Sequence, residues 1–157
     1  MLNYEILPIT DIKELYVFHL RQIRYYQIVQ EKISLETIKK DMKVHPDIVH
    51  DQDKYYLGIY CQNKLIGVID YLKHYRYPNS YDRNYIFIGL FMIDEQYQNK
   101  GYGTVIMKEF LKNDYHYQLG CYVENKQGYY FWEKMGFQVI DDINNYHECL
   151  DLYVMER

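Results

Sequence analysis

The first quarter of the chain changes from an alternating to a helical hydrophobic pattern. "LNYEILPI" (2–9) alternates with period two and predicts a strand. Thr10 is a predicted N-cap, and after it apolar side chains recur on roughly one helical face: Ile12, Leu15, Tyr16, Leu20 and Ile23. Residues 25–32 either prolong this helix or form a loop. Ser34 is a second predicted cap, for a helix that runs through Met42 and ends before the next proline.

The middle of the chain has the period and the turn residues of β-structure. "KYYLGIY" (54–60), the turn residues "QNK" and "LIGVIDYL" (65–72) predict a β-hairpin. Residues 73–84 are polar and aromatic with a Pro-Asn turn signal, and they predict a loop. "YIFIGLFMI" (85–93) is nearly all apolar, which is typical of a central strand covered on both faces.

The last third alternates between helical and strand patterns. After a seven-residue loop, a helix is predicted up to about Asn113, then a strand over 118–123. A helix over 126–135 is followed by Gly136, the residue type that a helix C′ position prefers. The remaining segments are two strands and the polar loop between them: 137–140, 149–155 and 141–147. No linker or repeat interrupts the pattern, so residues 1–157 predict one α+β domain.

Two glycines stand one residue apart where the third predicted helix begins, in "QNKGYG" (98–103). Each glycine weakens a helix by roughly 1 kcal/mol relative to Ala. A helix start offers unpaired N–H groups and the positive end of the helix dipole, and glycines let an anion approach the backbone closely. The alternative explanation is a loop turn followed by ordinary helix packing.

Two common phosphate-binding motifs do not fit this glycine pair. A Walker loop needs Lys and then Ser or Thr after its second glycine, but Gly103 is followed by Thr104 and Val105. A dinucleotide fingerprint needs a third glycine where Ile106 stands, and its glycines follow the strand at once. Both are therefore excluded.

The segment "FMIDEQYQNKGYGTVIMKEFL" (91–111) resembles the cofactor motif of the GNAT superfamily of N-acetyltransferases: a strand, a loop, Q/R-x-x-G-x-G/A and a helix. "ENKQGYYFWEKMGF" (124–137) is similar to the second family motif, N-x-x-A-x-x-F-Y-x-x-x-G-F. Gly128 replaces the usual Ala, and Trp132 stands where the family usually has Tyr. The order of predicted elements also agrees, so the resemblance extends over essentially the whole chain.

The resemblance implies a central mixed, mostly antiparallel twisted sheet of about seven strands flanked by about four helices. It also implies that backbone N–H groups of the glycine loop hold the pyrophosphate of acetyl-coenzyme A. That loop consists of Gln98, Asn99, Lys100, Gly101, Tyr102, Gly103 and Thr104.

The resemblance further implies that the central strand parts from the next strand in a V that admits the pantetheine arm. Phe91, Met92 and Ile93 occupy that stretch, and backbone groups of Phe91 and Ile93 would bond the pantetheine and polarise the thioester carbonyl. Asn125 would bond the pantetheine through its amide, cap its own helix, or do both. Trp132 would lie beside the cofactor.

Direct acetyl transfer needs a base for the ammonium proton and an acid for the departing thiolate. The indole of Trp132 is not a usable acid at neutral pH, which leaves Tyr129 and Tyr130 as candidates besides a packing role for each. A third possibility is that no side chain protonates the thiolate. Asp70, a carboxylate within an apolar strand pattern, is a candidate base, with a purely structural role as its alternative. Asp82 is another carboxylate, close before the central strand.

Composition and charge further limit the possible partners and cellular setting of the protein. An apolar fraction of 48% and a charged fraction of 25% are those of a soluble globular protein. A net charge of −4 argues against nucleic-acid binding and leaves a cationic amine substrate open. Three cysteines without CxxC spacing predict a reduced, cytoplasmic setting. No signal peptide or membrane span is predicted, and the six histidines match no compact metal-ligand pattern.

The sequence therefore predicts an acetyl-CoA-dependent N-acetyltransferase for a primary amine of a small molecule or protein, acting as a monomer or homodimer. One alternative is a non-catalytic sensor of the same fold that binds coenzyme A or an acyl derivative. Another is a nucleotide-binding protein, which NAD or ATP would stabilise and coenzyme A would not.

Overall fold

The computed structural model describes all residues from 1 to 157, and seven strands in it form one mixed sheet. The strands are β1 (Glu5–Pro8), β2 (Lys54–Cys61), β3 (Lys64–Arg76), β4 (Ser80–Ile93), β5 (His116–Tyr122), β6 (Gln138–His147) and β7 (Leu150–Glu156). The helices are α1 (Ile12–Arg21), α2 (Ile23–Val29), α3 (Leu35–Asp41), α4 (Tyr102–Phe110) and α5 (Lys126–Lys134), with short 3₁₀ turns at Asp51–Asp53 and Glu95–Tyr97. The predicted fold class is confirmed, with five α-helices where about four were expected.

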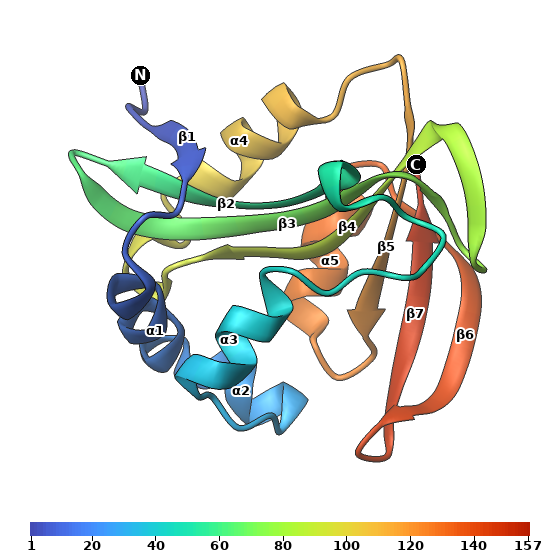
Figure 1. Ribbon diagram of the computed structural model, residues 1–157, viewed down its shortest axis with the longest axis horizontal. Coiled ribbons are helices and arrows are strands. Elements are labelled where there is room, and N and C mark those ends of the chain that lie inside the picture. Colours follow the sequence, from blue (N-terminus) through green and yellow to red (C-terminus); the bar gives the residue numbers. More distant parts are fainter.

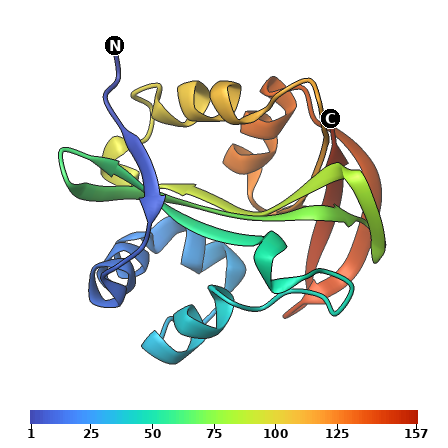
Figure 2. The same cartoon turned by 45° about the horizontal axis from the view of Figure 1, so that its top comes forward.

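The sheet lies between two layers of helices (Figures 1 and 2). Each layer has its own hydrophobic core. Helices α4 and α5 cover one face, where Ile106, Trp132 and Phe137 join the larger cluster of buried residues. Helices α1 and α3 cover the other face through a smaller cluster that includes Phe18 and Ile38. A strand covered on both faces is apolar at consecutive positions, which explains the apolar run of β4.

The strand order is β1-β2-β3-β4-β5-β7-β6, and only the β4–β5 pair is parallel. That pair is short: its register ends at Ile88 opposite Leu119, although β4 continues to Ile93. Gly89 is an extra residue in β4, because Asp70 pairs with Leu90 and the next β3 residue pairs with Ile88. Such a bulge bends a strand and increases its twist. The two strands therefore separate beyond Ile88, as the family resemblance implied.

The first helix begins one residue later than predicted. The side chain of Asp11, not Thr10, accepts hydrogen bonds from the backbone N–H groups that follow it. The predicted apolar face is wrong at Leu20 and Ile23, which are exposed. The chain breaks its helical course at Gln22, so the next segment is a separate helix, α2.

Three other boundaries differ from the prediction, while the cap at Ser34 is confirmed. Residues 73–84 were predicted as a loop but are mostly strand, because β3 and β4 pair almost to the turn at 77–79. Residues 141–147 were also predicted as a loop but belong to β6, an exposed edge strand held by backbone pairing with β7. Backbone pairing needs no apolar side chains, so a polar sequence concealed both strands. Helix α4 ends at Phe110 instead of Asn113.

Gly136 is confirmed at the end of α5, with a φ of +94°. Gly136→Ala is expected to lower the free energy of unfolding by about 1–2 kcal/mol, because a Cβ is disfavoured in left-handed backbone. Gly103→Ala is the control: its φ is not in the left-handed region and a Cβ would meet Phe131 at an ordinary 3.4 Å. This second change should leave stability unchanged or raise it by up to about 1 kcal/mol. Urea unfolding of both variants would test the pair, and equal effects would contradict the assignment.

Candidate active site

A cavity of about 290 Å³ lies where β4 and β5 separate. It contains four of the predicted site residues: Asp70, Phe91, Asn125 and Trp132. Its walls also include residues of α1, α2, α3, β2, β5, β6 and β7 and of the loop after α2, among them several tyrosines. The cavity therefore joins the helical layer of α1–α3 to the crevice beside α5.

The backbone of β4 turns peptide groups toward this opening. The N–H of Asp94 donates to the carbonyl of Ile66 on β3 at 2.8 Å, so the neighbouring Ile93 faces the opposite side. Gln98 Nε2 donates to that Ile93 carbonyl at 2.8 Å. By the same alternation, the peptide groups of Phe91 point toward the opening, while the Met92 side chain is buried in the core under α1 and α3.

The glycine loop presents unused backbone donors at the start of α4. Backbone N–H groups of residues 99–104 donate no hydrogen bond within the chain. Gly101 has a φ of +89°, which favours glycine, and leaves no side chain at the N-cap. A Cβ on Gly103 would contact the rings of Phe131 and Phe91, and Gln98 bonds Gln127 at the start of α5. The loop lies outside the cavity lining but adjoins it through Phe91.

Other side chains of the loop stabilise its surroundings. Tyr102 packs against Tyr97, and its hydroxyl lies 3.6 Å from Cys61 Sγ. Lys100 lies over the ring of Tyr97 at 5.4 Å. Asn99 has a positive φ of 58°, as Asn tolerates. None of these contacts uses the free N–H groups.

Asn125 is the N-cap of α5 and accepts a hydrogen bond from the Gly128 N–H at 3.1 Å. Its Nδ2 has no partner within the chain, and Asn125 lines the cavity. A Cβ at Gly128 would approach that Nδ2 to 2.5 Å, so the glycine makes room for the capping side chain. The cap role is established, and the Nδ2 group stays available to a ligand.

Trp132 is 7% exposed and packs among Phe91, Phe131 and Phe137 while reaching the cavity. The two candidate acids lie elsewhere. Tyr129 packs against Tyr153, and Glu133 beside it raises its pKa. Tyr130 is 64% exposed. Neither tyrosine lines the cavity, so the structure does not bring them together with Asp70.

Asp70 lies at the bulge of β4 and pairs with Lys54. Lys54 Nζ is 2.5 Å from Asp70 Oδ1, and both side chains are mostly buried. The other carboxylate oxygen faces Gly89. Burial raises the pKa of Asp70, and Lys54 opposes that shift. Asp70 therefore combines a structural ion pair with a position in the cavity.

Three lining residues form a hydrogen-bonded group: His19, Tyr26 and Tyr56. Sequence patterns did not identify His19 or Tyr56. His19 Nδ1 lies 2.7 Å from the Tyr26 hydroxyl, and its Nε2 lies 2.9 Å from the Tyr56 hydroxyl. Tyr56 lies directly opposite Asp70 in the β2–β3 register. Counting residues outward from the hairpin turn could therefore have predicted that Tyr56 lies beside Asp70. His19 had no such signal.

The cavity is acidic. Glu31, Asp41 and Asp70 line it, and no Lys or Arg does. Burial is the largest cause that raises the pKa of each of these carboxyl groups. Lys54 pairs with Asp70, and Lys54 and Lys40 act on Asp41, while His147 Nε2 lies 4.0 Å from Glu31. A cation that entered the cavity would therefore be favoured.

His19 gives a pH-dependent contribution to stability. Burial lowers its pKa from 6.5 to about 4. Since the folded pKa is below the unfolded value, this stability is complete above about pH 6.5. It should be lost progressively as the pH falls to about 4, by about 3 kcal/mol. Urea unfolding at several pH values would measure it, with His19→Gln as the reference that cancels other groups. A pH-independent difference between the two proteins would contradict the burial of a neutral ring.

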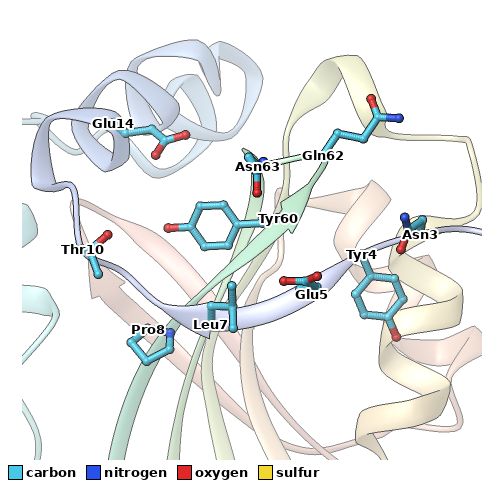
Figure 3. Close-up of a pocket in the computed structure, with 10 residues that line it drawn as sticks. All are labelled: Asn3, Tyr4, Glu5, Leu7, Pro8, Thr10, Glu14, Tyr60, Gln62 and Asn63. Carbon is cyan, nitrogen blue, oxygen red and sulfur yellow. The ribbon is translucent and has the colours of Figure 1, made fainter.

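A second, larger hollow of about 530 Å³ lies at the β1 edge of the sheet, between β1, the end of β2 and the start of α1 (Figure 3). Tyr60 and Glu14 are among its ten lining residues. It contains none of the predicted site residues, so the candidate site is the cavity at the separated strands.

The fold and the separated parallel pair define an acetyltransferase-type architecture. Residues 16–137 match the model of the Acetyltransferase (GNAT) family, and the chain therefore belongs to that family. No curated protein matches it. No helix is both long enough and apolar enough to cross a membrane, and no three His, Cys, Asp or Glu side chains are grouped to hold a metal ion.

Solved structures with the same fold have low sequence identity. An acetyltransferase from Thermus thermophilus is 20% identical with a TM-score of 0.74, and the match covers 99% of this chain and 98% of that one. Spermidine N-acetyltransferase from Vibrio cholerae, in complex with CoA and spermine, is 14% identical with a TM-score of 0.72, covering 98% and 94%. PaiA N-acetyltransferase from Thermoplasma acidophilum, in complex with coenzyme A, is 20% identical with a TM-score of 0.66, covering 99% of both chains.

Proposed function

We propose that this protein is an acetyl-CoA-dependent N-acetyltransferase that acts on a primary amine. The observation that carries the proposal is the continuity of three features. The free N–H groups of residues 99–104 adjoin Phe91, whose peptide groups face the opening between β4 and β5. That opening leads into an acidic cavity.

The chain's residues fit an extended thioester with a diphosphate. Successive unpaired N–H groups at a helix start hold phosphate well, and Gly101 and Gly103 place no Cβ in the way. The peptide groups of Phe91 and the Asn125 Nδ2 would bond the amides of the pantetheine arm. When bound, acetyl-CoA supplies the activated acetyl group. Two relatives of the same fold are in complex with CoA, which supports the assignment.

The acceptor is an amine that binds as a cation. Glu31, Asp41 and Asp70 attract an ammonium group, and tyrosine rings around them favour a cation through their faces. The spermidine N-acetyltransferase of the same fold has an acceptor of this chemistry. Whether the amine belongs to a small molecule or a protein is the question that an acceptor screen would answer.

Asp70 is the proposed group for the ammonium proton. Its raised pKa makes it a better base than an ordinary carboxylate, and it lies beside Gly89 at the point where the strands separate. Tyr129 and Tyr130 lie outside the cavity, and the indole of Trp132 supplies no proton. The thiolate is accordingly proposed to leave without a protein acid.

Asp70→Asn is expected to lower turnover by about tenfold or more, since an amide cannot accept the proton. Coenzyme A affinity should stay within about twofold. Asp82→Asn is the matched control, because Asp82 lies toward the far end of β4, 3.8 Å from Arg76, and does not line the cavity. Thiol release and calorimetric titration would measure both properties. Unchanged turnover in Asp70→Asn would remove Asp70 from the reaction.

The alternative is a coenzyme A sensor of the same fold, and it is favoured by the lack of an acid at Trp132. Thermal shift with coenzyme A, NAD and ATP would first identify the ligand. Coenzyme A at 100 times its dissociation constant should add roughly 2.7 kcal/mol of stability. Thiol release with a panel of amines then separates enzyme from sensor.

All three cysteines are free, which supports the proposed cytoplasmic setting. A monomer or homodimer remains a prediction for sedimentation analysis.

A further inference from the structure

His19 is part of the cavity wall and lies between two tyrosines that come from different elements. The ring belongs to α1 and is 3% exposed. Its two nitrogens bond the hydroxyls of Tyr26 on α2 and Tyr56 on β2, at 2.7 Å and 2.9 Å. The ring of Phe18 packs at its edge. Both nitrogens are therefore fully used by the two hydroxyls.

A neutral imidazole has one N–H and one bare nitrogen, so it cannot treat two partners alike. Burial keeps His19 neutral by lowering its pKa to about 4. One tyrosine must accept the ring N–H, and its own hydroxyl proton stays available to the cavity. The other must donate to the bare nitrogen, and it shows only lone pairs to the cavity. The ring therefore gives the two tyrosine hydroxyls, which are chemically the same, different hydrogen-bonding roles toward the cavity.

We propose that His19 is a positioning residue for the amine substrate. The hydroxyl of Tyr26 or Tyr56 that donates its proton to His19 has only lone pairs left for the cavity, and the other hydroxyl keeps its proton for the cavity. The hydroxyl with free lone pairs accepts a hydrogen bond from an N–H of the amine and so directs the nitrogen lone pair. The inference rests on the proposed function, because it assigns a role in binding that amine.

The charged groups around the two hydroxyls agree with this role. They come from every element packed there: Lys54 on β2, Asp70 on β3, Asp41 on α3 and Glu31 after α2. Burial and the nearby carboxylates raise the pKa of both tyrosines, so both hydroxyls keep their protons. They act in hydrogen bonding and not as phenolates.

Two amide variants separate orientation from simple packing. In His19→Asn the amide stands near the place of Nδ1 and can bond Tyr26, while in His19→Gln it stands near the place of Nε2 and can bond Tyr56. Each keeps one bond and frees the other hydroxyl. We expect both variants to lose at least tenfold in kcat/KM for the amine, with the KM for acetyl-CoA within about twofold. Tyr55→Phe is the control, since Tyr55 stacks with Tyr71 and does not line the cavity.

A merely structural His19 would give lower melting temperatures with an unchanged kcat/KM for the folded fraction, and that result would overturn the proposal. The double variant His19→Asn, Tyr56→Phe should lose much less kcat/KM for the amine than the two single losses multiplied together. Both substitutions remove the same hydrogen bond, the one between His19 and Tyr56. Fully additive effects of the two substitutions on kcat/KM would also contradict the positioning role.

Nitrogen NMR of the wild-type imidazole gives a readout that does not depend on activity. We expect a neutral ring with one protonated nitrogen down to about pH 5, and ordinary titration near pH 6.5 would overturn the proposal. An active wild type with unaffected His19 variants defeats this inference alone. A wild type that transfers acetyl to no amine defeats the proposed function, and the positioning role falls with it.

Discussion

Thr104→Glu is expected to weaken coenzyme A binding by about 1,000-fold while the fold stays intact. Thr104 is the third residue of α4, among the free N–H groups at its start. A carboxylate there would repel a diphosphate held about 4 Å away. Two unit charges at that distance interact by about 4 kcal/mol at an effective dielectric constant of 20, which corresponds to the stated loss. Calorimetric titration with coenzyme A would measure it.

The same substitution should not harm the protein without ligand. A negative charge in the first turn of a helix is favourable by about 0.3–1 kcal/mol, so the free energy of unfolding should stay equal or rise. Thr104→Gln matches the added volume without the charge and should lose far less affinity. Equal affinities of the glutamate variant and the wild type would show that the diphosphate is not held by this loop.

Lys54→Met is expected to lower the free energy of unfolding by about 3–5 kcal/mol at neutral pH. Lys54 is the partner of Asp70, with side chains that are 7% and 14% exposed. Removal of one member of a buried pair leaves the other charge without compensation. Asp41 also loses a positive neighbour. Urea unfolding would measure the change, and Lys73→Met, which removes only a contact over the Tyr55 ring, should cost no more than about 1 kcal/mol.

The pH dependence identifies the cause of that loss. Without Lys54, the folded pKa of Asp70 rises further above its unfolded value, so the folded state binds a proton more tightly. The stability deficit should therefore be greatest above the folded pKa and shrink as the pH falls through it toward about 4. Lys54→Met combined with Asp70→Leu should recover much of the loss. A deficit that is equal at pH 7 and pH 4 would show that the Lys54 side chain acts through packing.

Much of the fold could be predicted because its signals are local. The hairpin of β2 and β3 follows from alternation around a turn, and the apolar run 85–93 follows from burial on both faces of β4. Errors fell where backbone pairing alone holds the chain, as in β6, or where a break such as Gln22 ends a helix early. These positions have no apolar periodicity for a pattern to detect.

The candidate site also has parts that local sequence motifs predicted and parts that they did not. The glycine loop and Asn125 belong to short contiguous motifs, so their residue types and spacing indicate an anion site and a helix cap. Tyr129 and Tyr130 were proposed from their distance along the chain to Trp132. Tyr130, two positions before Trp132, lies on another face of α5 and is exposed, while Tyr129, three positions before it, packs against Tyr153 and does not line the cavity.

By itself, the sequence indicated the family, most of the order of the elements and a glycine loop with the features of an anion site, because each depends on residues within a few turns of one another. Only the tertiary structure decided which side chains meet beside the separated strands. His19 lies 37 residues before Tyr56, and Lys54 lies 16 residues before Asp70. Such partners are brought together by the packing of α1 and α2 on the sheet and by strand register, and no local pattern records that packing.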